Sequence, residues 1–330
     1  MVPGACLVNQ KSNISRRRWL AVAPAGVGLG LAANTMRSPL SEAVAADARD
    51  HAEPFGYCLN TSTIHGQKLS IVEEVAITSR AGYQGIEPWI RELEDHVKAG
   101  GNLRDLGKRI ADAGLSVESA IGFFDWAVDD EARRGKALEQ ARREMEMVQQ
   151  IGGKRIAAPP AGATDRSDMD LLKVAERYRA LLDLGDTIGV IPEVEVWGFS
   201  KALGRLGEAA FVAIESGHPH ACILPDVFHL YKGGSGQGGV RLLSGKAIGI
   251  FHFNDYPADP PRAQIDDSRR VYPGDGVAPL KDLVKTLRAI GYRGMLSLEL
   301  FNPEYWKADA LVVARTGLEK MRAVVRASLA

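Results

Sequence analysis

Four short apolar runs in the C-terminal half of the chain each carry an acidic or imidazole side chain near their end. These side chains are Glu193 or Glu195, Asp226, His252 and Glu299. Acidic side chains are rarely buried without a partner, so acids inside apolar runs require a compensating cation or hydrogen bonds. Carboxylate oxygens with one imidazole form a suitable ligand set for a divalent metal ion. We therefore expect one divalent ion here, with Mn²⁺ preferred and Mg²⁺, Co²⁺ or Zn²⁺ also compatible.

Two features of these runs leave their detailed roles open. Glu193 and Glu195 point to the same face of an extended segment, so spacing alone does not say which of them is the metal ligand. Any single acid in this set would more often be an ion-paired or hydrogen-bonded residue of the rim. Four on successive runs are much harder to explain in that way. His229, three residues after Asp226, is expected in the following loop, facing a substrate.

The chain after residue 54 has a pattern that would bring these four run ends together. Short runs rich in Ile, Val, Leu or Phe are typical of buried parallel strands. They lie at 55–60, 85–89, 116–121, 154–158, 190–197, 222–226, 248–254 and 295–301. Helical patterns of apolar residues separate many of them, with clear examples at 132–150, 171–188, 280–290 and 310–329. The connection after the sixth run is short and rich in glycine, so its helix is the least secure.

Eight strand–helix units predict a single-domain (β/α)₈ TIM barrel over residues 55–330. A doubly wound sheet would normally have fewer strands and a different ligand site. No shift in composition along residues 55–330 marks a second domain. In such barrels the catalytic groups lie at the carboxyl ends of the strands, which is where the four acidic and imidazole side chains are found.

The N-terminal segment has the features of an export signal. Arg16-Arg17-Arg18 precede an uncharged run at 21–33, and small residues suited to cleavage follow at 43–46. Such a run is too short and too weakly apolar for a comfortable membrane anchor, and the arginines are typical of a twin-arginine signal. We therefore expect export to the periplasm without stable membrane insertion. The expected boundaries are a twin-arginine-like signal peptide at 1–45 and a short linker at 46–54.

Composition excludes some partners and leaves others open. The 41 Lys and Arg residues balance the 41 Asp and Glu residues, so the chain has no overall electrostatic attraction for nucleic acid or an anionic membrane. Cys58 and Cys222 are the cysteines left after the leader, and two cysteines do not form a disulfide framework. A small-molecule substrate is expected, and a homo-oligomer is left open.

Several segments resemble one family. "GVIPEVEVWG", "LPDVFHLY", "FHFNDY", "RRVYPGDG" and "SLELFNPEYWK" resemble strand-end elements of the xylose isomerase-like TIM barrels of the sugar phosphate isomerase/epimerase superfamily. Within that superfamily the chain is most similar in style to inosose (2-keto-myo-inositol) isomerases. The resemblance spans residues 55 to 325 and is most specific in the eighth-strand element. The N-terminal leader is a departure, because sugar isomerases of this kind are usually cytoplasmic.

The resemblance assigns roles to individual residues. It implies that the metal ligands are Glu195, Asp226, His252 and Glu299. It also implies that Glu195 and Glu299 flank the substrate as the acid/base pair, while His229 and Arg270 hold substrate oxygens. An isomerase or epimerase of a keto-sugar or keto-cyclitol, acting through an enediolate, is the function that these roles imply.

Further contacts to a sugar are suggested by residues at other run ends. Glu87 ends the second run and either binds a sugar hydroxyl or forms a rim ion pair. Trp89, Trp126 and Trp197 either form apolar walls that stack against a sugar or only pack within the fold.

Two other functions remain open at this point. A metal-dependent lyase or dehydratase on an oxidised sugar would begin with the same proton abstraction and then expel a β-substituent. An exported non-catalytic sugar-binding protein with a relict site belongs to another class. Such a protein would be expected to lose a ligand, and none of the four expected ligands is lost.

Overall fold

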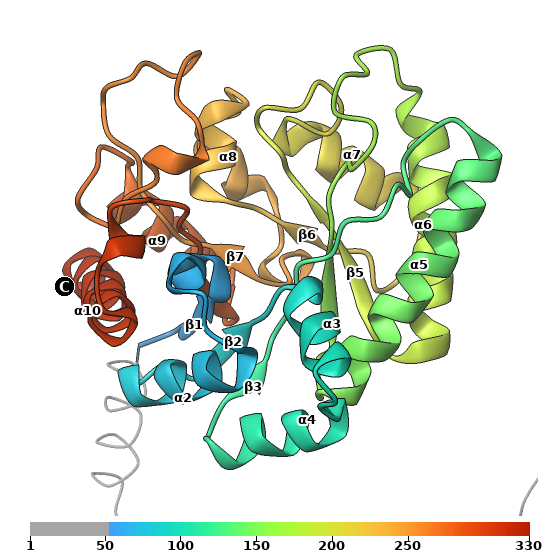
Figure 1. Cartoon of the computed structure of the whole chain (residues 1–330). Coiled ribbons are helices and arrows are strands. Elements are labelled where there is room, and N and C mark those ends of the chain that lie inside the picture. The colour runs from blue at the N-terminus through green and yellow to red at the C-terminus, as the bar shows by residue number, and fades with distance from the viewer. Residues whose placement is uncertain (1–52) are drawn as a thin grey trace, which may run out of the picture. The chain divides into compact units, whose positions relative to one another are not determined.

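Eight parallel strands and nine α-helices make up residues 53–330, which are the residues described by the computed structural model (Figure 1). The strands are β1 (Gly56–Asn60), β2 (Gly85–Glu87), β3 (Ser116–Val117), β4 (Arg155–Ala158), β5 (Ile191–Glu195), β6 (Ile223–Leu224), β7 (Phe251–His252) and β8 (Met295–Leu298). The helices are α2 (Ile71–Ala81), α3 (Ile90–Lys98), α4 (Leu103–Asp112), α5 (Glu131–Gln150), α6 (Leu171–Ile188), α7 (Leu206–Glu215), α8 (Val227–Lys232), α9 (Leu280–Ala289) and α10 (Ala310–Leu329). The expected signal peptide and most of the expected linker lie outside the described residues.

The strands follow one another around a closed barrel. Regular pairing gives the order β3-β2-β1-β8-β7 in one sheet and β4-β5-β6 in the other. Parallel bridges from Ile223 to Ile248 and from Asp226 to His252 join β6 to β7. The backbone N–H of Ala157 donates to the carbonyl of Ala120 at 2.8 Å and joins β4 to the segment after β3. These contacts confirm the TIM barrel expected from the strand count.

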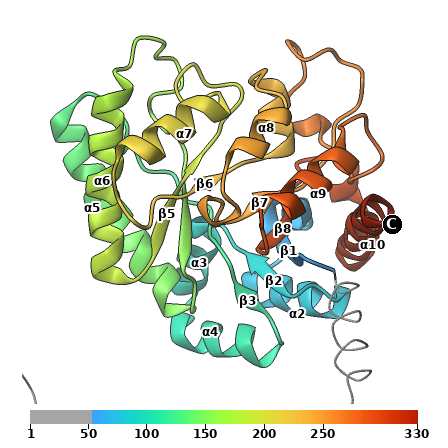
Figure 2. The same ribbon diagram turned by 180° about the vertical axis from the view of Figure 1, so that it is seen from behind.

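Helices cover the outside of the barrel, as both ribbon views show (Figures 1 and 2). Helix α6 illustrates why the sequence forms these elements. Its N-cap Asp170 accepts a hydrogen bond from the backbone N–H of Leu172, and it ends at Gly189, whose φ of 87° is easily adopted only without a side chain. The Tyr178 hydroxyl on its buried face donates to the carbonyl of Pro192 in β5 at 2.9 Å. The helix thereby fixes the strand that ends at Glu195.

The connection after β6 has no long helix, in line with its short, glycine-rich sequence. Helix α8 has only six residues, and two 3₁₀ turns at Gly238–Leu242 and Gly245–Ala247 replace a longer helix. Within residues 53–330, no helix combines the length and apolar character that crossing a bilayer requires. Cys58 and Cys222 are both buried and free.

Candidate metal centre and substrate pocket

The four expected metal ligands lie at the carboxyl ends of successive strands. Glu195 is the last residue of β5, His252 is the last of β7, and Glu299 follows β8 directly. Asp226 follows β6 by two residues and caps α8, because its Oδ1 accepts a hydrogen bond from the backbone N–H of His229 at 2.8 Å. Each of the four expected ligands is at most 3% exposed. The barrel therefore brings these groups together at one buried end.

Asp226, His252 and Glu299 form a cluster whose potential ligand atoms all lie within 4.8 Å of one another. His252 Nδ1 lies 3.0 Å from Glu299 Oε2 and 3.5 Å from Asp226 Oδ2. That nitrogen is buried and makes no hydrogen bond of good geometry within the described part of the chain. Burial opposes protonation, but the carboxylates of Glu299 and Glu87 raise the pKa of His252 well above its ordinary value. A divalent ion would replace that proton, so the donor set fits a metal.

Glu195 lies beside this cluster, and the structure separates it from Glu193. Burial, together with the nearby carboxylates of Glu299 and Asp226, raises the pKa of Glu195 to about 8. Its Oε2 is buried without a hydrogen-bond partner among residues 53–330. Glu193 lies one layer deeper, where it accepts a hydrogen bond from the backbone N–H of Ile250 at 3.0 Å. Glu195 is therefore the member of the pair that faces the cluster.

Arg270 supplies a fixed positive charge to the cluster. Its Nη1 donates to Asp226 Oδ2 at 2.7 Å and to Glu299 Oε2 at 2.8 Å, and its guanidinium is fully buried. Burial alone would raise the pKa of Asp226, but Arg270 holds it well below its ordinary value. A carboxylate offers about four lone-pair sites, so both acids retain sites for a second cation. The rings of Phe228 and Phe301 lie 4.9 Å and 5.1 Å from the guanidinium and restrict its position.

Asp255, which also follows β7, holds the loop next to Arg270 and is not part of the cluster. Its carboxylate accepts hydrogen bonds from four backbone N–H groups, at distances of 2.8 to 3.1 Å. The donors are Tyr256, Gly274, Gly276 and Ala278. An antiparallel bridge from Asp255 to Val271 ties the same loop to the residue after Arg270. Asp255 therefore helps to place the guanidinium.

His229 lies beside Arg270 and lines the same pocket. Its Nε2 lies 3.1 Å from Arg270 Nη2, and a guanidinium can only donate, so the imidazole proton belongs on Nδ1. Burial lowers the pKa of His229, and the positive charge of Arg270 lowers it further. Nδ1 is buried and has no partner among the described residues. The structure therefore presents a neutral imidazole with one unpaired N–H donor.

Glu87 lies behind the cluster, which differs from the expected contact with sugar or the rim. It is fully buried, and its Oε2 accepts hydrogen bonds from Ser297 at 2.7 Å and Asn60 at 2.9 Å. His252 Nε2 lies 3.0 Å from the same oxygen. Carboxylates in this position orient an imidazole so that its other nitrogen faces a metal. The structure thus makes Glu87 a positioning residue for His252, because its oxygens are occupied inside the barrel.

A pocket of about 420 Å³ opens directly above the cluster. Its polar side is formed by Glu195, His229, Asp267, Ser268, Arg270 and Glu299. Its remaining walls are mostly aromatic, from Trp89, Phe123, Trp197, Phe199, Phe301 and Trp306, with Ile121 and Pro303. Successive rings of Trp89, Phe123, Trp197 and Phe199 lie 5.1 to 5.7 Å apart and form a continuous wall. This combination of apolar walls and a few convergent polar groups is typical of a small-molecule site.

Trp126 is not part of this pocket, although a sugar-stacking role was one expectation for it. Its indole Nε1 donates to the carbonyl of Pro159 at 2.7 Å, and its ring packs against Tyr178 on the outer side of the barrel. Only 1% of Trp126 is exposed. Its position is explained by packing between helices, whereas Trp89 and Trp197 do line the pocket.

Sequence reasoning missed several residues of the site. Asn60 ends β1 and contacts Glu87, Trp89 and Glu299, at 2.9, 2.9 and 3.2 Å. The same strand-end argument that selected the acids would have found it. Phe123 and Phe199 lie on irregular segments and Trp306 lies in a three-residue 3₁₀ turn, where periodicity carries no signal about direction.

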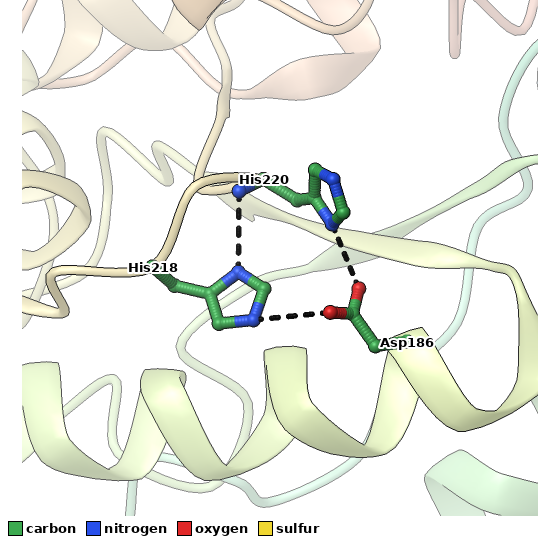
Figure 3. Close-up of side chains that lie close together, drawn as sticks. All are labelled: Asp186, His218 and His220. Carbon is green, nitrogen blue, oxygen red and sulfur yellow. Dashed lines mark hydrogen bonds and ion pairs between the residues drawn. The ribbon is translucent and has the colours of Figure 1, made fainter.

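Asp186, His218 and His220 form a second group of potential ligands (Figure 3). The elements that carry them place this group at the amino ends of the strands, opposite the cluster. Asp186 is near the end of α6, and the two histidines precede β6. The backbone N–H of His220 donates to His218 Nδ1 at 3.2 Å, so the proton of a neutral His218 belongs on Nε2. Nε2 faces Asp186 Oδ2 at 3.4 Å as a donor. This arrangement favours a hydrogen-bonded network over a metal site.

The chain belongs to the xylose isomerase-like TIM barrel family. The family model matches residues 75–324, which contain all four expected metal ligands and Arg270. The resemblance noted in the strand-end segments is thereby confirmed.

Relatives of established name include isomerases and dehydratases. The chain is 29% identical over 276 residues to an inosose isomerase of Bacillus licheniformis, covering 81% of this chain and 97% of the relative. It is 27% identical over 263 residues to a 3-dehydroshikimate dehydratase of Pseudomonas aeruginosa, covering 76% of this chain and 39% of the relative. The fold is similar to that in a crystal structure of the IolI protein with a zinc atom, with a TM-score of 0.76 and 22% identity. The match covers 83% of this chain and 99% of that chain and supports the fold.

Proposed function

We propose that the chain is a divalent-metal-dependent isomerase or epimerase of a keto-sugar or keto-cyclitol. The observation that carries this proposal is the buried cluster of Asp226, His252 and Glu299, of which Glu299 lines the aromatic pocket together with the neighbouring Glu195. The similarity to an inosose isomerase over nearly the whole of that relative supports the same class of reaction.

Glu195, Asp226, His252 and Glu299 would hold the ion. When bound, the metal would polarise a substrate carbonyl and stabilise negative charge on its oxygen. Of the ions that suit three carboxylates and one imidazole, we favour Mn²⁺, while Mg²⁺, Co²⁺ and Zn²⁺ also suit the set. Glu87 would keep His252 Nδ1 directed towards the ion through its contact with Nε2.

Glu195 and Glu299 would move the proton. One carboxylate removes the proton from the carbon next to the carbonyl, and the other returns a proton to the adjacent carbon or to the opposite face. Burial raises the pKa of Glu195, and a bound cation would lower it again and keep the carboxylate ionised, the form that can accept a proton. The two acids come from β5 and the end of β8, so they reach the pocket from different strands.

His229 and Arg270 would orient the substrate. The unpaired Nδ1–H of His229 is a donor for a substrate oxygen, and the Arg270 guanidinium offsets negative charge that develops near Glu299. Trp89 and Trp197 would exclude water and stack against the apolar face of the ring.

A lyase or dehydratase is the second candidate, and the similarity to 3-dehydroshikimate dehydratase favours it. The first step would be the same proton abstraction, after which a β-substituent leaves the substrate. The two functions therefore share the site and differ in the fate of one intermediate.

Incubation with a panel of keto-inositols and ketohexoses, each with added Mn²⁺, Co²⁺ or Zn²⁺, tests the proposal. We expect conversion of at least one substrate to an isomer of the same mass, and loss of that conversion with a chelator. A product lighter by one water would establish the dehydratase. Binding without any conversion across the panel would contradict both enzymatic functions and favour a binding protein.

We also propose that the protein is exported by the twin-arginine route, because of the Arg16-Arg17 pair before the mild apolar run. That route carries folded proteins and would suit a metal site that is filled before export. Replacing both arginines with Lys should retain full-length protein in the cytoplasm. Normal processing of that variant would contradict this proposal.

A further inference from the structure

A second hollow lies beside the substrate pocket. It has a volume of about 240 Å³ and lies between α3 and α5. The two hollows share Trp89, Ile121 and Phe123, which therefore form a ridge between them. The far side of the ridge is polar, with Arg91, Glu94, Gln140 and Glu144. The substrate pocket thus has a polar neighbour within reach of a larger ligand.

Glu144 is the unusual residue of this second hollow. It is only 6% exposed, and its Oε1 accepts a hydrogen bond from Gln140 Nε2 at 2.6 Å. Its Oε2 is buried and has no partner among residues 53–330. A buried polar atom without a partner costs free energy, so such atoms call for an explanation such as a ligand.

Gly122 makes room for this carboxyl. A Cβ at position 122 would lie 2.4 Å from Glu144 Oε2, which is closer than any real contact. The Gln140 amide that holds the other oxygen also donates to the carbonyl of Phe123 at 2.9 Å, so one side chain ties Glu144 to the ridge. The carboxyl is therefore held in place beside the wall that the two hollows share.

We propose that this hollow is a second subsite that binds a polyhydroxylated unit attached to the reacting ring, so that the substrate is a glycoside or disaccharide. The inference rests on the proposed function, because it places the keto ring of the same molecule at the metal centre. The attached unit would pass over Trp89 and Phe123 and bring its hydroxyl groups to Glu144.

The chemistry of the hollow favours a neutral sugar over an ionic group. Arg91 brings a positive charge and Glu94 a negative one, so neither sign of ligand is favoured by the rim. Burial raises the pKa of Glu144 to about 7, so near neutral pH its Oε2 can accept or donate a hydrogen bond to a hydroxyl. The Arg91 guanidinium lies over one face of the Trp89 ring, 4.2 Å from its centre, and its N–H groups are donors for hydroxyl oxygens at the ridge.

Glu144→Gln tests the subsite, because glutamine keeps an oxygen for Gln140 but replaces the free carboxyl oxygen. The matched control is Glu146→Gln, an exposed residue on the same helix. The probes are 3-ketoglucose and the 3-keto derivatives of trehalose and cellobiose. The readout is solvent deuterium incorporation in the presence of Mn²⁺, expressed as kcat/KM, together with calorimetric binding of each compound.

The expected result is at least a tenfold higher kcat/KM for a keto-disaccharide than for 3-ketoglucose. Glu144→Gln should reduce that ratio about tenfold, and Glu146→Gln should leave it unchanged. Equal kcat/KM values, or a ratio that is insensitive to Glu144→Gln, would overturn the subsite while leaving the proposed function intact.

Calorimetry keeps the inference testable if no compound exchanges its proton, an outcome that would count against the proposed function. A Kd for a disaccharide that is at least fivefold weaker in Glu144→Gln than in Glu146→Gln would then support the subsite. An unchanged Kd, or no binding of any disaccharide, would overturn it.

Discussion

Replacing Glu87 with glutamine should weaken metal binding without removing a metal ligand. The Glu87 carboxylate accepts hydrogen bonds from Ser297 and Asn60 and faces His252 Nε2 at 3.0 Å. Glutamine has nearly the same shape, but its amide NH₂ must then face one of these donors in a fully buried position. The imidazole would lose the negative charge that fixes which of its nitrogens carries the proton.

The size of the effect follows from these contacts. Replacing a partner of a metal-binding histidine costs about 10- to 100-fold in metal affinity. That range corresponds to about 1.4 to 2.7 kcal/mol, which agrees with the loss of one hydrogen bond to a charged group. Competition with a fluorescent chelator would measure the Kd for Mn²⁺ or Zn²⁺, and urea unfolding of the metal-free protein would report any loss of stability separately.

Glu193→Gln is the matched control, because Glu193 is a fully buried acid of the same barrel interior. Glutamine can still accept the hydrogen bond from the backbone N–H of Ile250, so metal affinity should change by less than about twofold. A Glu87→Gln protein whose metal affinity equals that of the Glu193→Gln protein would refute the positioning role of Glu87.

Three further predictions follow from the site and its surroundings. Asp226→Ala should lose the bound ion on dialysis, and full metal stoichiometry by mass spectrometry would contradict the ligand assignment. His229→Ala should raise KM about tenfold, which is the size of one lost hydrogen bond, with a smaller change in kcat. The control is His220→Ala at the far end of the barrel. An equal rise in KM in that variant would contradict a direct contact between His229 and the substrate. Burial raises the pKa of Glu144 to about 7, so the folded state holds this proton more tightly than the unfolded state, and the stability of the wild type falls as pH rises from about 4.5 to 7. Glutamine does not titrate, so the free energy of unfolding of Glu144→Gln minus that of the wild type should be about 2 to 3 kcal/mol larger at pH 8 than at pH 4.5. Urea unfolding at the two pH values measures this difference, and a pH-independent value would contradict the prediction.

The barrel was predictable because its strands are buried on both faces and read as short apolar runs. Seven of the eight runs begin within one residue of an observed strand, and helices α6 and α10 have the predicted bounds. Six of the eight observed strands end earlier than their runs, and at β5 and β8 this is because apolar residues continue into the pocket wall after the pairing stops. Trp197 and Phe301 are examples of residues counted as strand that line the pocket instead.

The convergence of the four acidic and imidazole side chains was also predictable, because all parallel strands of a barrel end at one face. Spacing alone could not choose between Glu193 and Glu195, since both satisfy the period of two, and Glu195 was expected only from the family resemblance. Residues two apart on a strand lie about 6.6 Å apart along it, so one reaches the mouth and the other stays in the layer below. Only the register of β5 against its neighbours decides which residue is which.

The direction of single side chains was the least predictable part. Glu87 ends its strand like the acids of the cluster, but the donors Asn60 and Ser297 come from neighbouring strands and hold it inside the barrel. Trp126 follows the third run, but the Pro159 carbonyl and the Tyr178 ring hold it among the helices. These contacts join residues that lie 27 to 210 positions apart in the sequence. Patterns within a short stretch of sequence therefore cannot predict them.

Solvent deuterium incorporation is the most direct test of the central claim that Glu195 and Glu299 exchange a proton next to a carbonyl. The metal-loaded protein would be incubated in deuterated water with each member of the keto-sugar and keto-cyclitol panel, and carbon-bound deuterium would be followed by NMR. We predict exchange at a carbon next to the carbonyl for at least one compound. Glu299→Gln should keep the fold while its exchange rate falls by about 10²-fold or more, the scale of a general-base contribution. Binding of these compounds without exchange by the wild-type protein, or equal exchange by Glu299→Gln, would contradict the account.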